Sequence, residues 1–459
     1  MKKKLIKIDK KKGKMLFQSP KGMHDILPED QFYWEKIRKS TSKISESFNF
    51  LRIDTPVVET AEVFERSGKA TDIVEKQMYF VKTKGGDKLV LRPEETAPIM
   101  RSYIQHNLSK LSRPLKLYYF GPMFRYEQPQ FGRFRQFYQA GFEILGGDDD
   151  PIYDAQAILT TLRLIEELKI KNLSIQINSI GCKQCRPGYV KKLQEFYKDK
   201  KDEICKDCRK RMINNPLRLL DCKNEKCGII KLEAPIILDR LCAGCKSHLK
   251  SVLEYLDELS LFYSLNPYLV RGLDYYNRTV FEIFIDKTQV SGADVSQKEE
   301  QGKKDKNRQL TALPIGLALA AGGRYDYLAE MLGGGKLSAV GGSVGVERLI
   351  EVMKAQGLGG IIKPEPQVFI VHIGEEAKKK SLNIFENLRQ AGIKVTESFG
   401  KESLKSQLRV ADKVKSFLSL ILGQREVFEE TVIIRNMRTG TQETVPIKKV
   451  VEEVKKRLK

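Results

Sequence analysis

The stretch KLYYFGPMFRYEQPQFGRFRQFYQAGFEILG, residues 116–146, decides the fold. It contains two aromatic-rich runs, residues 116–125 and 134–146, on either side of a short segment with proline, glycine and arginine. Aromatic runs bounded by turn-forming residues are typical of β-strands, and a short connection between two such runs is typical of a hairpin. The stretch therefore predicts a long antiparallel hairpin.

The second strand of this hairpin carries a mixed polar face. Residues i, i+2 and i+4 of a strand share one side, and here that side holds Arg135, Phe137, Gln139, Gly141 and Glu143. A strand that only walls a core would not place an amide and a carboxylate beside an aromatic ring and a gap. We therefore expect this face to border a ligand, and the exposed polar face of an edge strand is the alternative.

Charged residues mark both ends of the hairpin loop and a turn upstream of it. Arg125 and Glu127 precede the loop and Arg133 follows it. Guanidinium groups bind phosphate oxygens bidentately, which favours a polyphosphate ligand over ordinary surface charges. The turn LRPEETAP, residues 91–98, supplies Glu94 as a candidate anchor for a substrate ammonium group.

All eight cysteines lie between residues 182 and 245, in four close pairs. Such pairs are typical of tetrahedral zinc sites, and closed four-thiolate sites are structural, not catalytic. We predict one or two zinc ions, with reduced free thiols as the alternative. The pairs are Cys182 with Cys185, Cys205 with Cys208, Cys222 with Cys227, and Cys242 with Cys245.

Size and charge limit the class of protein. A chain of 459 residues suggests about three domains. Lys and Arg number 81 against 59 Asp and Glu, and the net charge of +22 favours a polyanionic partner such as nucleic acid. No apolar run reaches the ~20 residues that span a bilayer, so we expect no membrane contact and a cytoplasmic location. The segment GGSVGVER, residues 341–348, is neither a P-loop nor a dinucleotide fingerprint.

In chain order, these motifs resemble class II aminoacyl-tRNA synthetases, and among them the histidyl-tRNA synthetase family. The resemblance covers nearly the whole chain, and the paired signatures RGLDYY and GGRYD are its most specific part. The residues that carry it are KGMHDILPED, RIDTPVVE around Pro56, LRPEETAP, the hairpin from FRYEQ to FEILG, LVRGLDYYNRTVFEI, AAGGRYDYL and SVGVERL.

The resemblance implies an α+β fold: an antiparallel sheet of six or seven strands flanked by helices, a small Cys-rich insertion domain and a C-terminal α/β anticodon-binding domain. It also implies a homodimer that activates L-histidine with ATP and Mg²⁺, and then transfers the histidyl group to the 3′ end of tRNA(His). One rival is a non-catalytic paralogue that regulates ATP phosphoribosyltransferase, which would lack the anticodon-binding domain and some arginines. A zinc-dependent nucleic-acid-binding protein without activity is the other.

The resemblance further implies roles for individual residues. Arg271 is expected against the histidine carboxylate and the α-phosphate, where other class II enzymes use a metal ion, and Arg125 is expected on the same phosphate. The remaining ATP contacts would come from Glu127, Arg133, Phe137 and Arg348. The histidine contacts would come from Glu94, Thr96, Gln139, Glu143, Tyr276 and Tyr325, with Glu143 and Tyr276 on the imidazole nitrogens.

The chain departs from the family pattern at two places. Glu95 stands where the common PEGT form has glycine, so an extra negative charge lies beside Glu94. Gly342 and Ser343 stand where the third class motif usually has bulkier residues. We expect the glycines of that motif to let a ligand lie flat against the strand.

The predicted domains follow from the motifs and from shifts in composition. Alternating strands and helices predict a separate α/β domain at the C-terminus, beyond a linker marked by Pro364 and Pro366. One helix of that domain carries Lys401, Lys405, Arg409 and Lys413 at i, i+4 steps, a basic stripe suited to a phosphate backbone. The domains are a basic disordered tail (1–14), the catalytic domain in two parts (15–181 and 251–362, with a flexible loop at 286–310), the Cys-rich insertion (182–250) and the anticodon-binding domain (363–459).

The segment LVRGLDYYNRTVFEI, residues 269–283, cannot be strand throughout if both of its ligand contacts are correct. In a continuous strand Arg271 and Tyr276 would point to opposite faces. We therefore predict a loop at residues 272–276 and a strand that begins near Arg278. Phe281, Ile283 and Ile285 would then face the core, and Asp274 would form a supporting ion pair with Arg278.

Overall fold

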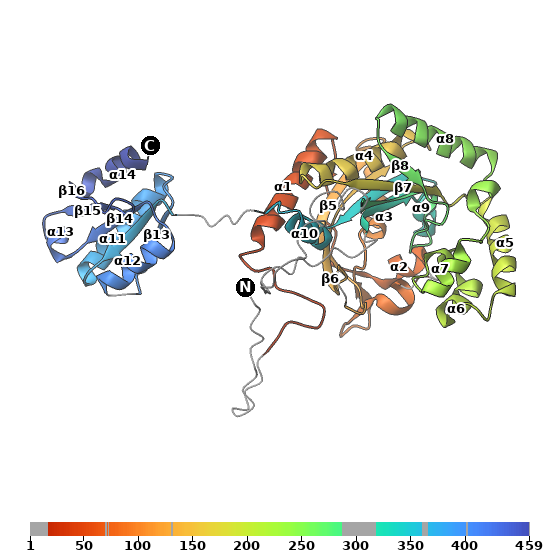
Figure 1. The fold of residues 1–459 in the computed structure, drawn as a ribbon, viewed down its shortest axis with the longest axis horizontal. Helices are drawn as coiled ribbons and strands as arrows, with labels where there is room; N and C mark the ends of the chain where they lie inside the picture. The colour runs from red at the N-terminus through yellow and green to blue at the C-terminus, as the bar shows by residue number, and fades with distance from the viewer. Residues whose placement is uncertain are drawn as a thin grey trace, which may run out of the picture. The chain divides into compact units, whose positions relative to one another are not determined.

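The computed structural model describes residues 17–68, 71, 73–129, 132–286, 318–359, 366–400 and 403–458. The chain forms two compact units, Met1–Gly359 and Gly360–Lys459 (Figure 1). The predicted tail at 1–14, the predicted loop beyond Asp286, Pro364 and Lys401 lie outside the described residues.

The first unit is built on an antiparallel sheet, as predicted (Figure 1). Within the described residues the sheet has eight strands in the order β1-β5-β6-β11-β10-β9-β7-β8. The six inner strands pair antiparallel, whereas the short edge strands β1 and β8 pair parallel with their neighbours. The strands are β1 Leu51–Arg52, β5 Leu115–Phe124, β6 Gln136–Leu145, β7 Leu173–Ser179, β8 Tyr263–Leu265, β9 Asn277–Ile285, β10 Ala318–Arg324 and β11 Ala339–Gly345.

The predicted hairpin is confirmed as β5 and β6, paired from Leu115 with Leu145 to Phe124 with Gln136. The segment around Pro56 forms two separate strands, β1 and β2. β1 joins the large sheet, and β2 (Val58–Thr60) joins a small sheet with β4 (Lys88–Leu91) and β3 (Tyr79–Lys82). Proline has no N–H for a ladder, so the chain leaves one sheet before Pro56 and enters the other after it.

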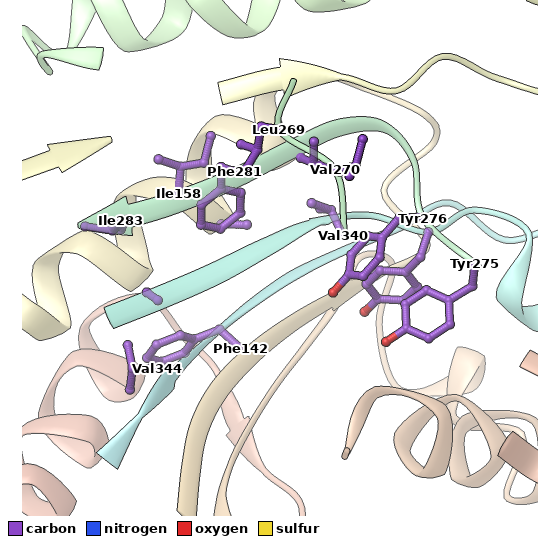
Figure 2. Packing of buried hydrophobic residues seen from close by; sticks show 14 of the residues in the cluster. Phe142, Ile158, Leu269, Val270, Tyr275, Tyr276, Phe281, Ile283, Val340 and Val344 are labelled. Atoms are coloured by element: carbon purple, nitrogen blue, oxygen red, sulfur yellow. The ribbon is translucent and has the colours of Figure 1, made fainter. Parts of the chain in front are cut away.

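Helices cover one face of the large sheet, and α4 (Ile152–Glu167) packs across β6, β10 and β11. Figure 2 shows Phe281 of β9 beside Ile158 of α4 in this apolar layer. A Cβ on Gly342 would lie 2.7 Å from Phe281 and 2.7 Å from Thr161 of α4. The expected ligand contact at Gly342 is therefore wrong, because this glycine makes room for helix packing. The other helices on this side are α1 Gln31–Ser47, α8 Ala243–Glu258 and α10 Val346–Ala355.

The cysteine-rich segment is mainly helical. Its helices are α5 (Arg186–Asp199), α6 (Lys206–Asn214) and α7 (Glu225–Lys231), with 3₁₀ turns η3 (Pro216–Asp221) and η4 (Ile237–Arg240). Their buried residues continue the apolar core of the sheet without a break. The remaining helices of the unit are α2 Ala61–Ser67, α3 Thr96–Gln105 and α9 Leu328–Met331, with short turns η1 Ile73–Gln77 and η2 Leu108–Lys110.

The second unit confirms the predicted alternation of strands and helices. Its five described strands have the order β13-β12-β14-β15-β16, parallel at first and antiparallel at the end. Across the described parts of both units, no helix combines the length and the apolar character needed to cross a membrane. The elements are β12 Val368–His372, α11 Glu375–Gln390, β13 Val395–Glu397, α12 Leu404–Lys413, β14 Leu418–Leu422, α13 Gln424–Phe428, β15 Thr431–Asn436, β16 Gln442–Pro446 and α14 Val450–Leu458.

Candidate active site

The segment before β9 is a loop, as predicted, and β9 begins at Asn277. The guanidinium of Arg271 lies 5.7 Å from the centre of the Tyr276 ring, so the loop brings both residues to one place. Arg271 Nη1 also donates a 2.5 Å hydrogen bond to Glu282 of β9. The expected pair of Asp274 with Arg278 is wrong. Asn215 donates to Asp274 at 2.6 Å, and Arg278 pairs with Asp149.

Glu143 of β6 is buried between two hydroxyl groups. Thr96 Oγ1 donates to it at 2.8 Å, and Tyr325 Oη donates to its other oxygen. Burial raises the pKa of Glu143 to about 8, although both hydrogen bonds oppose that rise. Gly341 lies opposite Glu143 on β11, and any Cβ there would overlap the carboxylate. Only glycine at position 341 leaves room for the carboxylate of Glu143.

Two further carboxylates lie in the turn before α3. Glu94 accepts hydrogen bonds from the backbone N–H groups of Thr96 (2.7 Å) and Ala97 (3.1 Å) and from Tyr275 Oη (3.3 Å), and burial raises its pKa. Glu95 has separate partners: Arg92 pairs with it at 2.9 Å, and Thr55 Oγ1 donates at 2.7 Å. Burial raises the pKa of Glu95 to about 7. Glu95, the unusual acidic residue beside Glu94, is therefore paired with a buried cation of its own, Arg92.

Three tyrosines form the wall next to these acids. The Tyr275 ring centre lies 4.8 Å from that of Tyr276 and 5.8 Å from that of Tyr325, and Figure 2 shows Tyr275 and Tyr276 together where β9 begins. The gap predicted at Gly141 is filled, because a Cβ there would lie 2.5 Å from the Tyr119 ring of β5. Gln139 Nε2 lies 3.5 Å from Ser343 Oγ of β11.

Arginines gather beside the acids. Arg125 Nε donates at 2.9 Å to the carbonyl of Pro93, and its guanidinium lies 5.1 Å from the centre of the Phe137 ring. Arg133 pairs with Glu127 at 3.3 Å. Arg348 donates to the backbone carbonyls of Gly132 (3.1 Å) and Ala318 (2.6 Å).

The electrostatics of these arginines indicate a site for an anion. Burial lowers the pKa of Arg348 to about 10, and the positive charges of Arg133 and Arg125 add to this effect. Burial also lowers the pKa of Arg125, and the charge of Arg271 contributes in the same direction. Arg348 and Arg125 are therefore repelled by neighbouring guanidinium groups in a partly buried place, and a polyanion would relieve that repulsion.

Three residues of this site were missed in the sequence. Tyr275 donates a hydrogen bond to Glu94, and Glu282 accepts one from Arg271. Arg186, the first residue of α5, donates to the carbonyls of Tyr276 (2.5 Å), Gly181 (3.1 Å) and Ile180 (3.0 Å). A charge inside the apolar run VFEIFI was a signal for Glu282. No local sequence pattern indicated a role for Arg186 in this site, because the residue belongs to the Cys-rich insertion.

The eight cysteines form two groups of four. Within each group the sulfur atoms all lie within 4.8 Å of one another. The first pair in the sequence meets the fourth, and the second meets the third. The outer group is Cys182, Cys185, Cys242 and Cys245, and the inner group is Cys205, Cys208, Cys222 and Cys227.

An antiparallel sheet with partly buried arginines beside buried acids is the arrangement expected of the class of protein that the sequence motifs resemble, the class II aminoacyl-tRNA synthetases. Comparison with known proteins narrows this class. The family model described as histidyl-tRNA synthetase matches residues 22–293, and the one described as anticodon binding domain matches residues 367–457. The chain belongs to the histidyl-tRNA synthetase family.

Relatives match over almost the whole chain. A histidine–tRNA ligase of Thermodesulfovibrio yellowstonii is 42% identical over 96% of this chain and 99% of its own length, and one of Dehalococcoides mccartyi is 40% identical over 96% and 100%. The apo histidyl-tRNA synthetase of S. aureus superposes with a TM-score of 0.74 at 31% identity, covering 96% of this chain and 100% of its own. A Bacillus halodurans structure described as an ATP phosphoribosyltransferase regulatory subunit/histidyl-tRNA synthetase shares the fold, with a TM-score of 0.59 at 19% identity over 89% of this chain and 98% of its own.

Proposed function

We propose that this chain activates L-histidine with ATP to form histidyl-adenylate and then transfers histidine to the 3′ end of tRNA(His). One observation carries the proposal: a set of buried carboxylates adjoins a set of partly buried guanidinium groups. Arg125 interacts electrostatically with Glu94 on one side and with Arg271 on the other. An amino acid with an ammonium group, joined to a triphosphate, complements both sets.

In this proposal the acidic side binds histidine. Glu94, with Thr96 and Gln139, receives the ammonium group, since a cation stabilises the ionised form of a buried carboxylate. Glu143 and Tyr276 bind the two imidazole nitrogens, and Tyr325 keeps Glu143 in place through the bond already present. Buried, hydrogen-bonding groups of this kind reject amino acids that would leave them unpaired.

The cationic side binds ATP. Arg125 and Arg271 contact the α-phosphate, Arg133 contacts the terminal phosphates, and Phe137 with Arg348 flanks the adenine once Arg125 has turned to the phosphate. Glu127 contacts the adenine or the tRNA end. Mg²⁺ would accompany the β- and γ-phosphates and neutralise part of their charge, and the carboxylate of Glu127, which pairs with Arg133, would be available to hold it.

The first step requires cations and rigid positioning more than proton transfer. The histidine carboxylate is already ionised, so no general base is needed when it attacks the α-phosphate. Negative charge builds up on that phosphate, and preorganised guanidinium groups stabilise it. Glu282 holds Arg271 in position for this task.

Partners beyond the substrates are part of the proposal. The match of residues 367–457 to an anticodon binding domain supports tRNA binding by the second unit. A homodimer is supported by apolar residues exposed around Pro56, namely Leu51 (56% exposed), Val57 (37%) and Val58 (39%). We also propose a cytoplasmic location, where tRNA(His) would be available as a substrate.

The regulatory paralogue is the weaker alternative. It would not need Arg125, Arg271 and Arg348 together, nor a second unit with an anticodon-binding match. The decisive measurement is histidine-dependent exchange between ATP and pyrophosphate, run with histidine and with each other amino acid.

We expect exchange with histidine alone and a loss of roughly 10²–10³-fold in Arg271→Ala, because one preorganised charge is removed. Arg209→Ala is the matched control, since Arg209 is an exposed arginine of α6 that pairs with Asp202. Absence of exchange with histidine, or full exchange in Arg271→Ala, would refute the proposed mechanism.

A further inference from the structure

The two groups of cysteines have the spacing of tetrahedral metal ligands. Zn–S bonds of ~2.3 Å at tetrahedral angles place neighbouring sulfurs ~3.8 Å apart. Sulfur atoms joined in a disulfide would lie only ~2.0 Å apart. The separation is 3.8 Å between Cys182 and Cys185, Cys182 and Cys242, Cys185 and Cys245, and Cys205 and Cys222.

Local structure favours the thiolate form at some of these sulfurs, whereas burial raises the pKa of Cys208, Cys227 and Cys245. Cys185, Cys205 and Cys242 each stand at the N-cap of a helix, where the helix dipole favours negative charge. The backbone N–H of Cys182 donates to Cys185 Sγ at 3.3 Å, and that of Cys205 donates to Cys227 Sγ at 3.3 Å. N–H donation stabilises a thiolate more than a thiol.

The sulfur atoms of each group lie close enough together to bind one metal ion. Sulfurs that all lie within 4.8 Å of one another surround one metal, whereas the ligands of an iron–sulfur cluster surround a cage of several atoms. Four thiolates in tetrahedral array are typical of zinc. In each group at least one sulfur belongs to a fully buried residue: Cys208, Cys227 and Cys245 are each 1% exposed.

We propose that the chain holds two zinc ions, one in the inner group and one in the outer group, and that the outer ion fastens the insertion to the catalytic sheet beside Tyr276. The outer group joins the start of the insertion at Cys182 to its end at Cys245. A single ion in the outer group would therefore close the segment from Cys182 to Cys245, which contains the inner group, into one loop.

The outer ion is linked to the loop at residues 272–276 and to the start of β9 by short contacts of the residues beside its ligands. Gly181, next to Cys182, accepts a 2.9 Å hydrogen bond from the N–H of Arg278. Arg186, next to Cys185, donates to the carbonyl of Tyr276 at 2.5 Å. A Cβ on Gly272 would lie 2.8 Å from Arg218 of the insertion, so the loop and the insertion are in contact there too. Loss of the outer ion would release Arg186 and leave Tyr276 less well positioned.

The first test counts metal in the full-length protein purified without chelator. Elemental analysis should find two zinc ions per chain, one in Cys242→Ser, one in Cys227→Ser, and none in the double variant. Replacement of zinc by Co²⁺ in the wild type should give the visible absorption of tetrahedral thiolate coordination. Folded protein that carries no zinc, or iron in place of zinc, would overturn the proposal, as would a Co²⁺ spectrum without thiolate bands.

The second test addresses the role of the outer ion, and this part rests on the proposed function. Cys242→Ser should raise the KM for histidine roughly tenfold with a smaller change in kcat, because a displaced binding group weakens binding first. Cys227→Ser, which removes one thiolate from the inner group, should raise it less. Equal KM values in the two variants would refute the positioning role. Two zinc ions in a wild type without histidine-dependent exchange would refute the proposed function and leave the metal sites standing.

Discussion

The hydroxyl of Thr96 donates a 2.8 Å hydrogen bond to the carboxylate of Glu143. This bond joins the first turn of α3 to the last part of β6, across 47 positions of the chain. Because the carboxylate is fully buried, its pKa rises to about 8 from an ordinary value of 4.5. We therefore expect the free protein to hold a proton on Glu143 at neutral pH.

This proton makes the stability of the fold depend on pH. The folded state keeps it up to about pH 8, whereas the unfolded chain releases it near its ordinary pKa, so stability is fully present below that value and falls as pH rises towards 8. The slope from this group is at most about 1.4 kcal/mol per pH unit. Glu143→Gln, which cannot ionise, should flatten the dependence.

Urea unfolding between about pH 5 and pH 8 measures this difference. Glu62→Gln is the control, because Glu62 lies on the surface in a pair with Arg66. Its pH dependence should match that of the wild type. An unchanged slope in Glu143→Gln would show that Glu143 is already ionised in the free protein.

Glu95 should be needed for stability in spite of its unusual position. Its carboxylate pairs with Arg92, and the side chains of the two residues are only 1% and 6% exposed. Removal of one partner of a buried pair leaves the other charge uncompensated and costs about 3–5 kcal/mol. We therefore expect Glu95→Gln to lower the free energy of unfolding by roughly that amount, measured in urea at a pH above the Glu95 pKa of about 7, where the carboxylate is ionised. Glu62→Gln, in an exposed pair, should change it by less than about 0.5 kcal/mol; equal losses in both variants would contradict the argument.

Local pattern in the sequence was sufficient to predict much of the fold. The β5–β6 hairpin followed from two aromatic runs around a turn, which depend on neighbours within a few residues. The loop before β9 followed from parity together with the family resemblance, because Arg271 and Tyr276, which the resemblance places on one ligand, would point apart in a strand. The alternation of elements in the second unit is local in the same sense.

Features that depend on distant contacts could not be predicted. Gly342 was expected to border a ligand, yet it faces Thr161 of α4. Arg278 was expected to pair with Asp274, yet it pairs with Asp149. In each case the residue that makes the contact lies more than a hundred positions away along the chain. No local sequence pattern indicates such a contact.

Arg186 should act as a positioning residue for histidine. Its guanidinium holds the carbonyl groups of Ile180, Gly181 and Tyr276, and so ties the insertion to the loop that carries Tyr276. Arg186→Gln should raise the KM for histidine in the exchange reaction by about tenfold while kcat changes less. Arg186→Lys should restore only part of the affinity, because an ammonium group cannot hold three carbonyls in a planar fork.

The control for Arg186 is Arg209→Gln, on the exposed side of α6. A loss confined to kcat would mean that Arg186 affects the chemical step instead of the position of Tyr276. Thermal unfolding of each variant separates either effect from general destabilisation.

The basic face of α12 should contribute to tRNA binding and not to histidine activation. Lys405, Arg409 and Lys413 are all exposed on this helix. Phosphate contacts of this kind add affinity without sequence information, and each lost contact lowers the salt dependence. The triple change of these residues to Ala should raise the KM for tRNA at least tenfold, leave histidine-dependent exchange unchanged, and reduce the slope of log KM against log salt.

The matched control uses cations of the same unit that already have carboxylate partners. On α11, Lys379 pairs with Glu376 at 2.6 Å, and Arg389 pairs with Glu386 at 2.7 Å. Because those charges are locally compensated, their double change to Ala should alter tRNA aminoacylation much less than the α12 triple. Equal effects of the two sets would mean that tRNA responds only to the net charge of the unit. An effect of the α12 triple on exchange with histidine would place this helix in the first step of the reaction, contrary to the separation proposed here.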